Sequence, residues 1–155
     1  MDARFRRATK EIRACNEDVH SGIKVEPFDS SPFHLKGSFP GPRGTPYEGG
    51  VFEVDIVFSE SYPFQPPQIE FITKVYHPNI SPESGAICLD ILQDHWSPTL
   101  TIRTALISVQ SLLSSPESSD SLDTAASQHY VRNKDSFDKT ARDWTLTYAT
   151  GQQTS

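Results

Sequence analysis

The spacing of hydrophobic residues divides the chain into helical and extended stretches. The first apolar positions recur at helical intervals, namely Phe5, Ala8, Ile12, Cys15 and Val19. This period predicts an amphipathic helix that buries one stripe of side chains and turns its basic residues outward. Cys15 lies at the edge of the stripe, and we interpret it as a small packed side chain.

Beyond residue 23 the period changes to two. Apolar and polar residues alternate along 33–39 and 52–58, and a shorter stretch of this kind runs from Gln68 to Lys74. Alternation of this period predicts half-buried strands. The breaks between the strands, GPRGTPYEGG and SESYPFQPP, are short and dense in Gly and Pro. Such short breaks favour an antiparallel meander.

Helical spacing returns in the second half of the chain. The apolar positions are Ile102, Ala105, Leu106, Val109, Leu112 and Leu113, followed by Phe137, Ala141, Trp144 and Tyr148. This spacing predicts two or three helices. Because the strands form one block with the helices outside it, the pattern indicates an α+β domain. We expect one core domain over residues 1–150 and a short flexible tail over 151–155.

Residues 75–98 show no clear period. A long irregular stretch inside a small domain is usually functional. It contains Cys88, which follows Gly85 and lies between two apolar residues. A cysteine thiolate both accepts and releases acyl groups, so a nucleophilic Cys88 would suit an acyl carrier.

Two residues of the sequence HPN lie close before this cysteine. The amide of Asn79 could donate a hydrogen bond to a developing oxyanion, or it could only tie its own loop together. His77 could pair with Cys88 as in a thiol hydrolase. We favour a hydrogen-bonded structural His77, because a site that activates water would destroy a thioester.

Composition excludes several classes of protein. The net charge of -6 argues against nucleic-acid binding, which usually requires an excess of Lys and Arg. No apolar run approaches the roughly 20 residues that span a bilayer, and the charged N-terminus lacks the apolar centre of a signal peptide. The two cysteines are far apart and fit free thiols in a reducing compartment. We therefore expect a cytoplasmic or nuclear protein, or one found in both places, without a membrane partner.

Charge and histidine placement add two further expectations. Residues 1–13 hold five basic residues against two acidic ones, a local charge of +3 on an otherwise acidic chain. This basic end is either a docking surface or a solvated helix face. The five histidines are scattered and none has ligand spacing with a cysteine, so we expect no metal site.

The irregular stretch resembles a known active-site signature. The sequences YHPNI, GAICLDIL and WSP are similar to that of ubiquitin-conjugating (E2) enzymes, and TPYEGGVFEVDI and YPFQPP resemble the third strand and the Pro-rich loop of the same family. The similarity runs from about Arg4 to Thr150. It implies a ubiquitin-conjugating core with an N-terminal helix, a four-stranded antiparallel meander sheet, a central helix and C-terminal helices.

The resemblance also implies an activity and its partners. A member of this family is an acyltransferase in protein ubiquitination and degradation. It accepts ubiquitin from an E1 activating enzyme as a cysteine thioester and passes it to lysines of substrates or ubiquitin with E3 ligases of the RING or HECT type. No cofactor is bound. ATP is consumed by the activating enzyme, although family members are sometimes described as ATP-binding or nucleotide-binding. We expect a monomer.

Catalytic roles carry over to matching positions. Cys88 corresponds to the thioester-forming residue, and Asn79 to the asparagine that supports the oxyanion or its loop. Asp120 corresponds to an acid near the incoming lysine, the alternative being one more solvent-facing acid. The loop SPESSDSLD is less Pro-rich than in many relatives, so we expect a more mobile gate around Asp120.

Binding roles carry over in the same way. Tyr76 would wall the lysine channel, and Leu89 and Ile107 would contact the donor ubiquitin. Arg6 on the basic first helix, Phe64 and Pro98 would dock E1 or E3. For Phe64, an exposed aromatic beside prolines fits an interface anchor, and ordinary packing is the alternative.

Three stretches resemble one subgroup of the family most closely. They are HLKGSFPGPRGTPYEGG, KVYHPNIS and ALISVQSLLSSPE. Members of that subgroup usually carry a C-terminal ubiquitin-associated domain and build lysine-48-linked chains. That domain is absent from this sequence, either because the sequence is part of a longer protein or because the protein naturally lacks it. A non-catalytic ubiquitin-binding variant of the fold is the remaining alternative, and the presence of Cys88, Asn79 and Asp120 counts against it.

Overall fold

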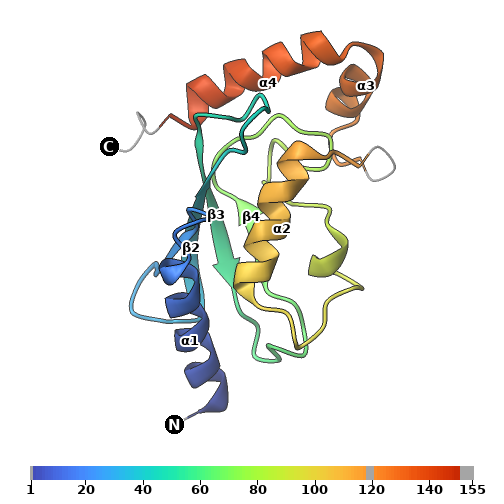
Figure 1. Ribbon diagram of the computed structural model, residues 1–155. Helices are drawn as coiled ribbons and strands as arrows, with labels where there is room; N and C mark the ends of the chain where they lie inside the picture. Colours follow the sequence, from blue (N-terminus) through green and yellow to red (C-terminus); the bar gives the residue numbers. More distant parts are fainter. Residues whose placement is uncertain (1, 118–120, 151–155) are drawn as a thin grey trace.

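The computed structural model describes residues 2–117 and 121–150, which form helices around one sheet (Figure 1). The expected tail over 151–155 and Asp120 lie outside the described residues. The elements in chain order are α1 (Ala3–Glu17), β1 (Lys24–Pro27), β2 (His34–Pro40), β3 (Val51–Val57), β4 (Gln68–Phe71), the short 3-10 helix η1 (Asp90–Leu92), α2 (Ile102–Ser114), α3 (Thr124–Arg132) and α4 (Lys134–Tyr148).

The four strands pair in the order β1-β2-β3-β4, each antiparallel to its neighbour. This confirms the α+β class and the antiparallel meander. Along β2 and β3 every second residue is buried, as the alternation in the sequence predicts. The buried residues of the sheet and the apolar stripe of α2 belong to one hydrophobic core. The other face of the sheet carries the polar residues of the alternation.

Two expected boundaries were wrong. The first helix ends at Glu17, and Val19 lies beyond it with 80% of its surface exposed. The carboxylate of Asp18 accepts the backbone N–H groups of His20 and Ser21, and this local turn replaces further helix.

The last strand is also shorter than expected, because β4 ends at Phe71 instead of continuing to Lys74. The N–H groups of Ile72 and Thr73 both point to the carbonyl of Glu53, so regular pairing with β3 stops there. Three helices follow the irregular stretch, α2 to α4, as the spacing of apolar residues predicts. No helix in the described parts of the chain has the length and apolar character to cross a bilayer.

Candidate active site

Cys88 is held by backbone pairing to two other segments. Its N–H donates to the carbonyl of Asn79 at 2.9 Å, next to an isolated antiparallel bridge between Ile80 and Ile87. A second bridge joins Ala86 to Glu70 of β4. The Cys88 side chain is half-buried and forms no disulfide. The structure therefore brings Cys88 and Asn79 together on a segment that is fixed to the edge of the sheet.

Gly85 makes this attachment possible. Its φ is +80°, in the left-handed region that glycine tolerates best. A Cβ atom at this position would also overlap the carbonyl oxygen of Phe71. Because the N–H of Phe71 donates to the Gly85 carbonyl at 2.8 Å, the two backbones must approach closely. Only glycine fits both requirements three residues before Cys88.

Asn79 is fully buried and binds the loop that follows α2. Its Nδ2 donates to the carbonyl of Glu117 at 2.7 Å, and its Oδ1 accepts the Glu117 N–H at 2.8 Å. The carbonyl of Pro78 accepts the N–H groups of Leu122 and Asp123 at 2.9 and 3.1 Å. Both flanks of the segment that contains Asp120 are therefore tied to the dipeptide Pro78–Asn79. This geometry supports the loop-binding role of Asn79.

His77 has no exposed surface, and both of its ring nitrogens are used. Nδ1 accepts the backbone N–H of Asn79 at 3.0 Å, so the ring proton is on Nε2, which lies 2.8 Å from the carbonyl of Leu112 in α2. Burial lowers the pKa of His77 to about 4. The ring is thus a neutral link between the HPN sequence and α2. The structural role is confirmed, and the thiol hydrolase alternative loses its candidate base.

Tyr76 joins the same segment to the C-terminal helices. Its hydroxyl lies 2.9 Å from Nδ1 of His129 in α3, and its ring packs beside Phe137 and Trp144 of α4. Burial raises the pKa of the phenol. Its role in a lysine channel stays a prediction.

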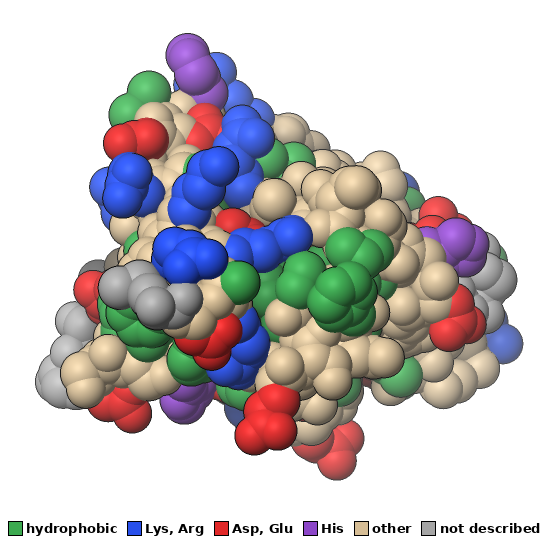
Figure 2. Space-filling model, turned by 90° about the horizontal axis from the view of Figure 1, so that it is seen from below, with side chains coloured by type: hydrophobic (Ala, Val, Ile, Leu, Met, Phe, Trp, Pro, Cys, Tyr) green, Lys and Arg blue, Asp and Glu red, His purple; other side chains and the backbone are tan. Residues whose placement is uncertain are grey.

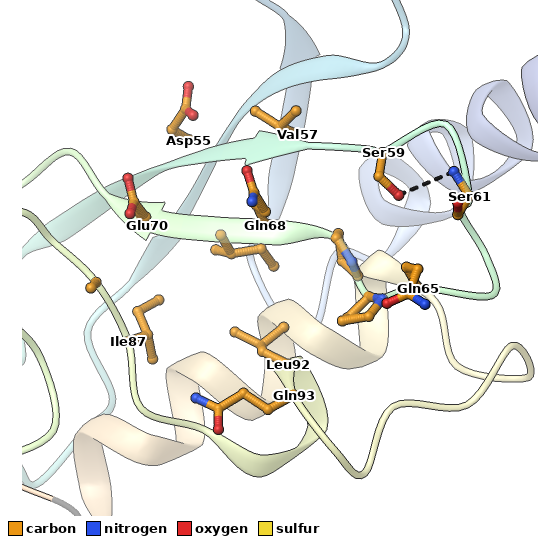
Figure 3. A pocket seen from close by; sticks show the side chains of 14 residues that line it. Asp55, Val57, Ser59, Ser61, Gln65, Gln68, Glu70, Ile87, Leu92 and Gln93 are labelled. Atoms are coloured by element: carbon orange, nitrogen blue, oxygen red, sulfur yellow. Dashed lines mark hydrogen bonds between the residues drawn. The ribbon is translucent and has the colours of Figure 1, made fainter.

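Leu89 and Ile107 are both half-buried and pack against the core, Leu89 just before η1 and Ile107 on α2. A cavity of about 540 Å³ lies between β4 and residues on both sides of Cys88 in the chain (Figure 3). Ile87 and Leu92 line one side of it and Gln68 the other. Cys88 itself is not among the residues that line this cavity. The contact of Leu89 and Ile107 with ubiquitin stays a prediction.

The three docking residues named from the sequence are all exposed. Phe64 has 76% of its surface exposed, which excludes ordinary packing, and Arg6 and Pro98 are exposed as well. Trp96 joins the loop that contains Phe64 to the loop that contains Pro98, since its indole N–H donates to the carbonyl of Pro63 at 2.7 Å. Figure 2 shows Lys and Arg side chains gathered beside hydrophobic ones on this end of the molecule.

The basic residues of α1 divide into two groups. The guanidinium of Arg4 lies over the ring of Phe33 and donates to the carbonyls of Phe58 and Ser59, and Arg7 binds Glu11 and the carbonyl of Leu100. The side chains of these two arginines are therefore occupied by contacts within the chain. The exposed members are Arg6, Lys10 and Arg13, which follow helical spacing and form one basic face, called here the basic face of α1.

Sequence reasoning did not identify Glu11 and Tyr62. A signal for Glu11 was present, because it lies three residues after Ala8 and four before Cys15, in line with the buried stripe of α1.

Cys15 itself is confirmed as a packed residue, since it has no exposed surface and burial raises the pKa of its thiol to about 12. Thiol chemistry near neutral pH is left to Cys88. The described residues contain no group of three or more side chains suited to a metal ion.

Comparison with known proteins gives consistent matches. The family model described as "Ubiquitin-conjugating enzyme" matches residues 7–145. "Ubiquitin-conjugating enzyme E2 27" of Arabidopsis thaliana is 53% identical over 147 residues, which cover 94% of this chain and 76% of that protein. "Ubiquitin-conjugating enzyme E2 1" of Schizosaccharomyces pombe is 52% identical over 148 residues, 96% of this chain and 68% of that protein. The crystal structure of a putative ubiquitin conjugating enzyme from Plasmodium yoelii superposes with a TM-score of 0.92 at 47% identity, covering 97% of this chain and 98% of that one.

Proposed function

This chain belongs to the ubiquitin-conjugating enzyme family, an acyltransferase class, and on that premise we propose that Cys88 is the residue that carries ubiquitin. One observation carries the assignment. Of the two cysteines, Cys15 is fully buried with a raised pKa, whereas Cys88 is half-buried on a backbone-anchored segment beside Asn79. A nucleophilic thiol needs both access and a thiolate, which Cys15 lacks.

The proposed chemistry consists of two acyl transfers. In the first, Sγ of Cys88 attacks the thioester carbonyl that joins ubiquitin to the activating enzyme. The new C–S bond forms and the cysteine of that enzyme leaves as a thiolate. In the second, a lysine amine attacks the Cys88 thioester, a C–N bond forms, Cys88 leaves as a thiolate and the amine loses a proton to solvent or to a base. Neither transfer needs a cofactor within this chain, and ATP is consumed by the activating enzyme.

Asn79 and Asp120 are proposed to serve the second transfer. Asn79 binds the loop before Asp120 through Glu117, while Pro78 binds the residues after it. A carboxylate at Asp120 would orient the incoming amine and assist its deprotonation. Tyr76, which directly precedes the HPN sequence, would line the path of the incoming lysine. Leu89 and Ile107 would contact the donor ubiquitin.

The partners of the family are ubiquitin, an E1 and E3 ligases. We propose that Arg6, Phe64 and Pro98 dock E1 and E3 ligases of the RING or HECT type. Support comes from their exposure and from the Trp96 hydrogen bond that joins the loops of Phe64 and Pro98. We also propose a monomer in the cytoplasm, the nucleus or both, in keeping with two cysteines that form no disulfide.

Lysine-48-linked chain building is a further part of the proposal. Its support is the similarity of three sequence stretches to the subgroup that makes this linkage. Incubation with E1, E3, ubiquitin and ATP, followed by mass spectrometry of the products, tests it. Products linked through other lysines would reject the linkage and leave the thioester assignment untouched.

A non-reducing gel tests the central assignment. The protein is incubated with E1, ubiquitin and ATP, and wild type should shift to an adduct that a thiol reductant removes. Cys88→Ala should give no adduct, whereas Cys88→Ser should give a slower-reacting oxyester, because an alkoxide leaves less readily than a thiolate. Cys15→Ala is the matched control and should load normally. Loading that survives in Cys88→Ala would move the site, and no adduct with wild type would reject the carrier function.

A further inference from the structure

Glu11 is a buried carboxylate at a junction of three segments. It lies on the core-facing stripe of α1 with only 5% of its surface exposed. The Tyr62 hydroxyl lies 2.7 and 2.8 Å from its two oxygens, the Ile102 N–H donates at 2.8 Å, and Arg7 Nε donates at 2.6 Å. A buried charge is tolerated only when it is paired and hydrogen-bonded, and all three donors come from different parts of the fold.

Each of the three contacts involves a residue on, next to or hydrogen-bonded to a loop that contains a proposed docking residue. Tyr62 lies on the loop of residues 59–67, called here the Phe64 loop, two positions before Phe64. Arg7 donates a second hydrogen bond, from Nη2 to the carbonyl of Leu100 at 2.7 Å, on the segment 96–101, called here the Pro98 loop. Ile102 is the first residue of α2, directly after that loop.

The Glu11 carboxylate lies at the N-terminal end of α2 and accepts one of its first backbone N–H groups. The first N–H groups of a helix have no partner within the helix, and a negative charge is favourable there. The Thr101 hydroxyl accepts the N–H of Thr104, and Glu11 accepts that of Ile102. Glu11 thus ties the first residue of α2 to α1, beside the hydrogen bond by which Arg7 holds the Pro98 loop.

The junction lies behind a groove on the surface. The groove, about 670 Å³, runs between the start of α1 and the Phe64 loop, and Arg4, Arg7, Tyr62 and Phe64 are among its lining residues. The view in Figure 2 shows basic and hydrophobic side chains side by side on this end of the molecule. The relative position of the basic residues and the two loops therefore depends on what holds the loops to α1.

We propose that Glu11 is a positioning residue for partner binding: it holds the Phe64 and Pro98 loops in register with the basic face of α1. This inference rests on the proposed docking of E1 and E3 at that end of the molecule. It assigns Glu11 no part in the chemistry at Cys88. Loss of the carboxylate should therefore weaken recognition by partners and leave the intrinsic reactivity of the thioester unchanged.

Glu11→Gln is the most informative variant because it keeps the shape of the side chain. A glutamine oxygen can still accept from Tyr62 and Ile102, but its NH₂ group cannot accept from Arg7, which is also a donor. Tyr62→Phe removes one hydroxyl donor and leaves the charge in place. Glu17→Gln is the matched control, since Glu17 is an exposed glutamate on the same helix.

Two measurements separate positioning from general destabilisation. The first is steady-state loading by E1 as a function of the concentration of this protein, which gives KM and kcat separately. The second is single-turnover discharge of the preloaded thioester to free lysine without an E3. For Glu11→Gln we expect KM to rise about threefold or more, with kcat and E3-free discharge within about twofold of wild type. Tyr62→Phe should raise KM in the same direction by a smaller factor.

Three results would overturn the proposal. They are an unchanged KM in Glu11→Gln, an equal rise in Glu17→Gln, or E3-free discharge that falls in parallel with loading. If Glu11→Gln does not fold, Tyr62→Phe decides, and an unchanged KM there rejects the inference. Failure of the proposed function would look different, because wild type itself would then form no adduct with E1 and ubiquitin.

Discussion

Replacement of Asn79 by alanine tests how the loop that contains Asp120 is held. The side chain has no exposed surface and makes two hydrogen bonds to the backbone of Glu117, at 2.7 and 2.8 Å. Alanine removes both bonds. We expect loading of Cys88 by E1 to survive, because the backbone hydrogen bond between Cys88 and residue 79 remains, and discharge to lysine to fall.

The magnitude follows from the number and setting of these bonds. A typical intramolecular hydrogen bond contributes about 0.5–1.5 kcal/mol net, so two give about 1–3 kcal/mol of unfolding free energy. Glu117 is exposed, and water can replace part of what its backbone loses, which favours the lower end of this range. For a chain of this size, 1 kcal/mol corresponds to about 2–4 °C in Tm. A lost oxyanion donor, by contrast, lowers the rate by about 10²–10³.

The assay combines thermal unfolding with single-turnover discharge of preloaded enzyme to free lysine. Loop anchoring predicts a measurable drop in Tm together with slower discharge, of roughly tenfold or less. Glu117→Gln is the matched control, because the two bonds use the backbone of Glu117, and it should match wild type in both readouts. Discharge at the wild-type rate in Asn79→Ala would refute both roles of Asn79. A loss of 10² or more with an unchanged Tm would refute loop anchoring as the cause.

Three further predictions concern Gly85, His77 and Phe64. Gly85→Ala should lower the unfolding free energy in urea by about 2 kcal/mol or more, from left-handed strain and overlap with Phe71. Gly49→Ala, where φ is +90° and nothing lies near the added Cβ, should cost only the strain, and equal losses would reject the overlap. Because burial lowers the pKa of His77 from 6.5 to about 4, the unfolded chain binds more protons, and stability should fall by about 3 kcal/mol as pH drops from 6.5 toward 4. A pH series of Tm values should show a shallower fall in His77→Gln, and identical slopes would contradict it. Phe64→Ala should change the free energy of unfolding by no more than about 0.5 kcal/mol, since Phe64 is exposed. The KM for loading by E1 should rise. An unchanged KM would remove Phe64 from the docking surface.

Local pattern predicted β2, β3 and the start of β4 because its cause is local, whereas β1 (Lys24–Pro27) was not among the alternating stretches and the four-stranded count came from the family resemblance. In β2 and β3 a residue faces the core or the solvent according to its position in the pleat, so the alternation of apolar and polar residues is visible without any partner strand. The end of α1 was harder to predict. Val19 continues the helical spacing of apolar residues, but the Asp18 side chain forms a competing turn that the spacing does not reveal.

The site divides in the same way. Cys88, Asn79 and His77 are recognisable from sequence, since they lie within a dense motif with a fixed order. Their tasks depend on contacts with distant residues. His77 binds Leu112, and Asn79 binds Glu117, in both cases more than thirty residues along the chain. Two alternatives that the sequence left open, a catalytic or a structural His77 and a packed or an exposed Phe64, were decided by those contacts and by exposure.

Periodicity and a contiguous motif are enough to identify the family, the α+β class and the two cysteines. Folding settles which of the two thiols is accessible, which arginines of α1 contact other segments, and that Glu11 joins α1 to Tyr62 and to the start of α2. Burial and hydrogen-bond partners arise from segments that come together only on folding. A glutamate in a helix has the same local spacing whether solvent or three buried donors surround it.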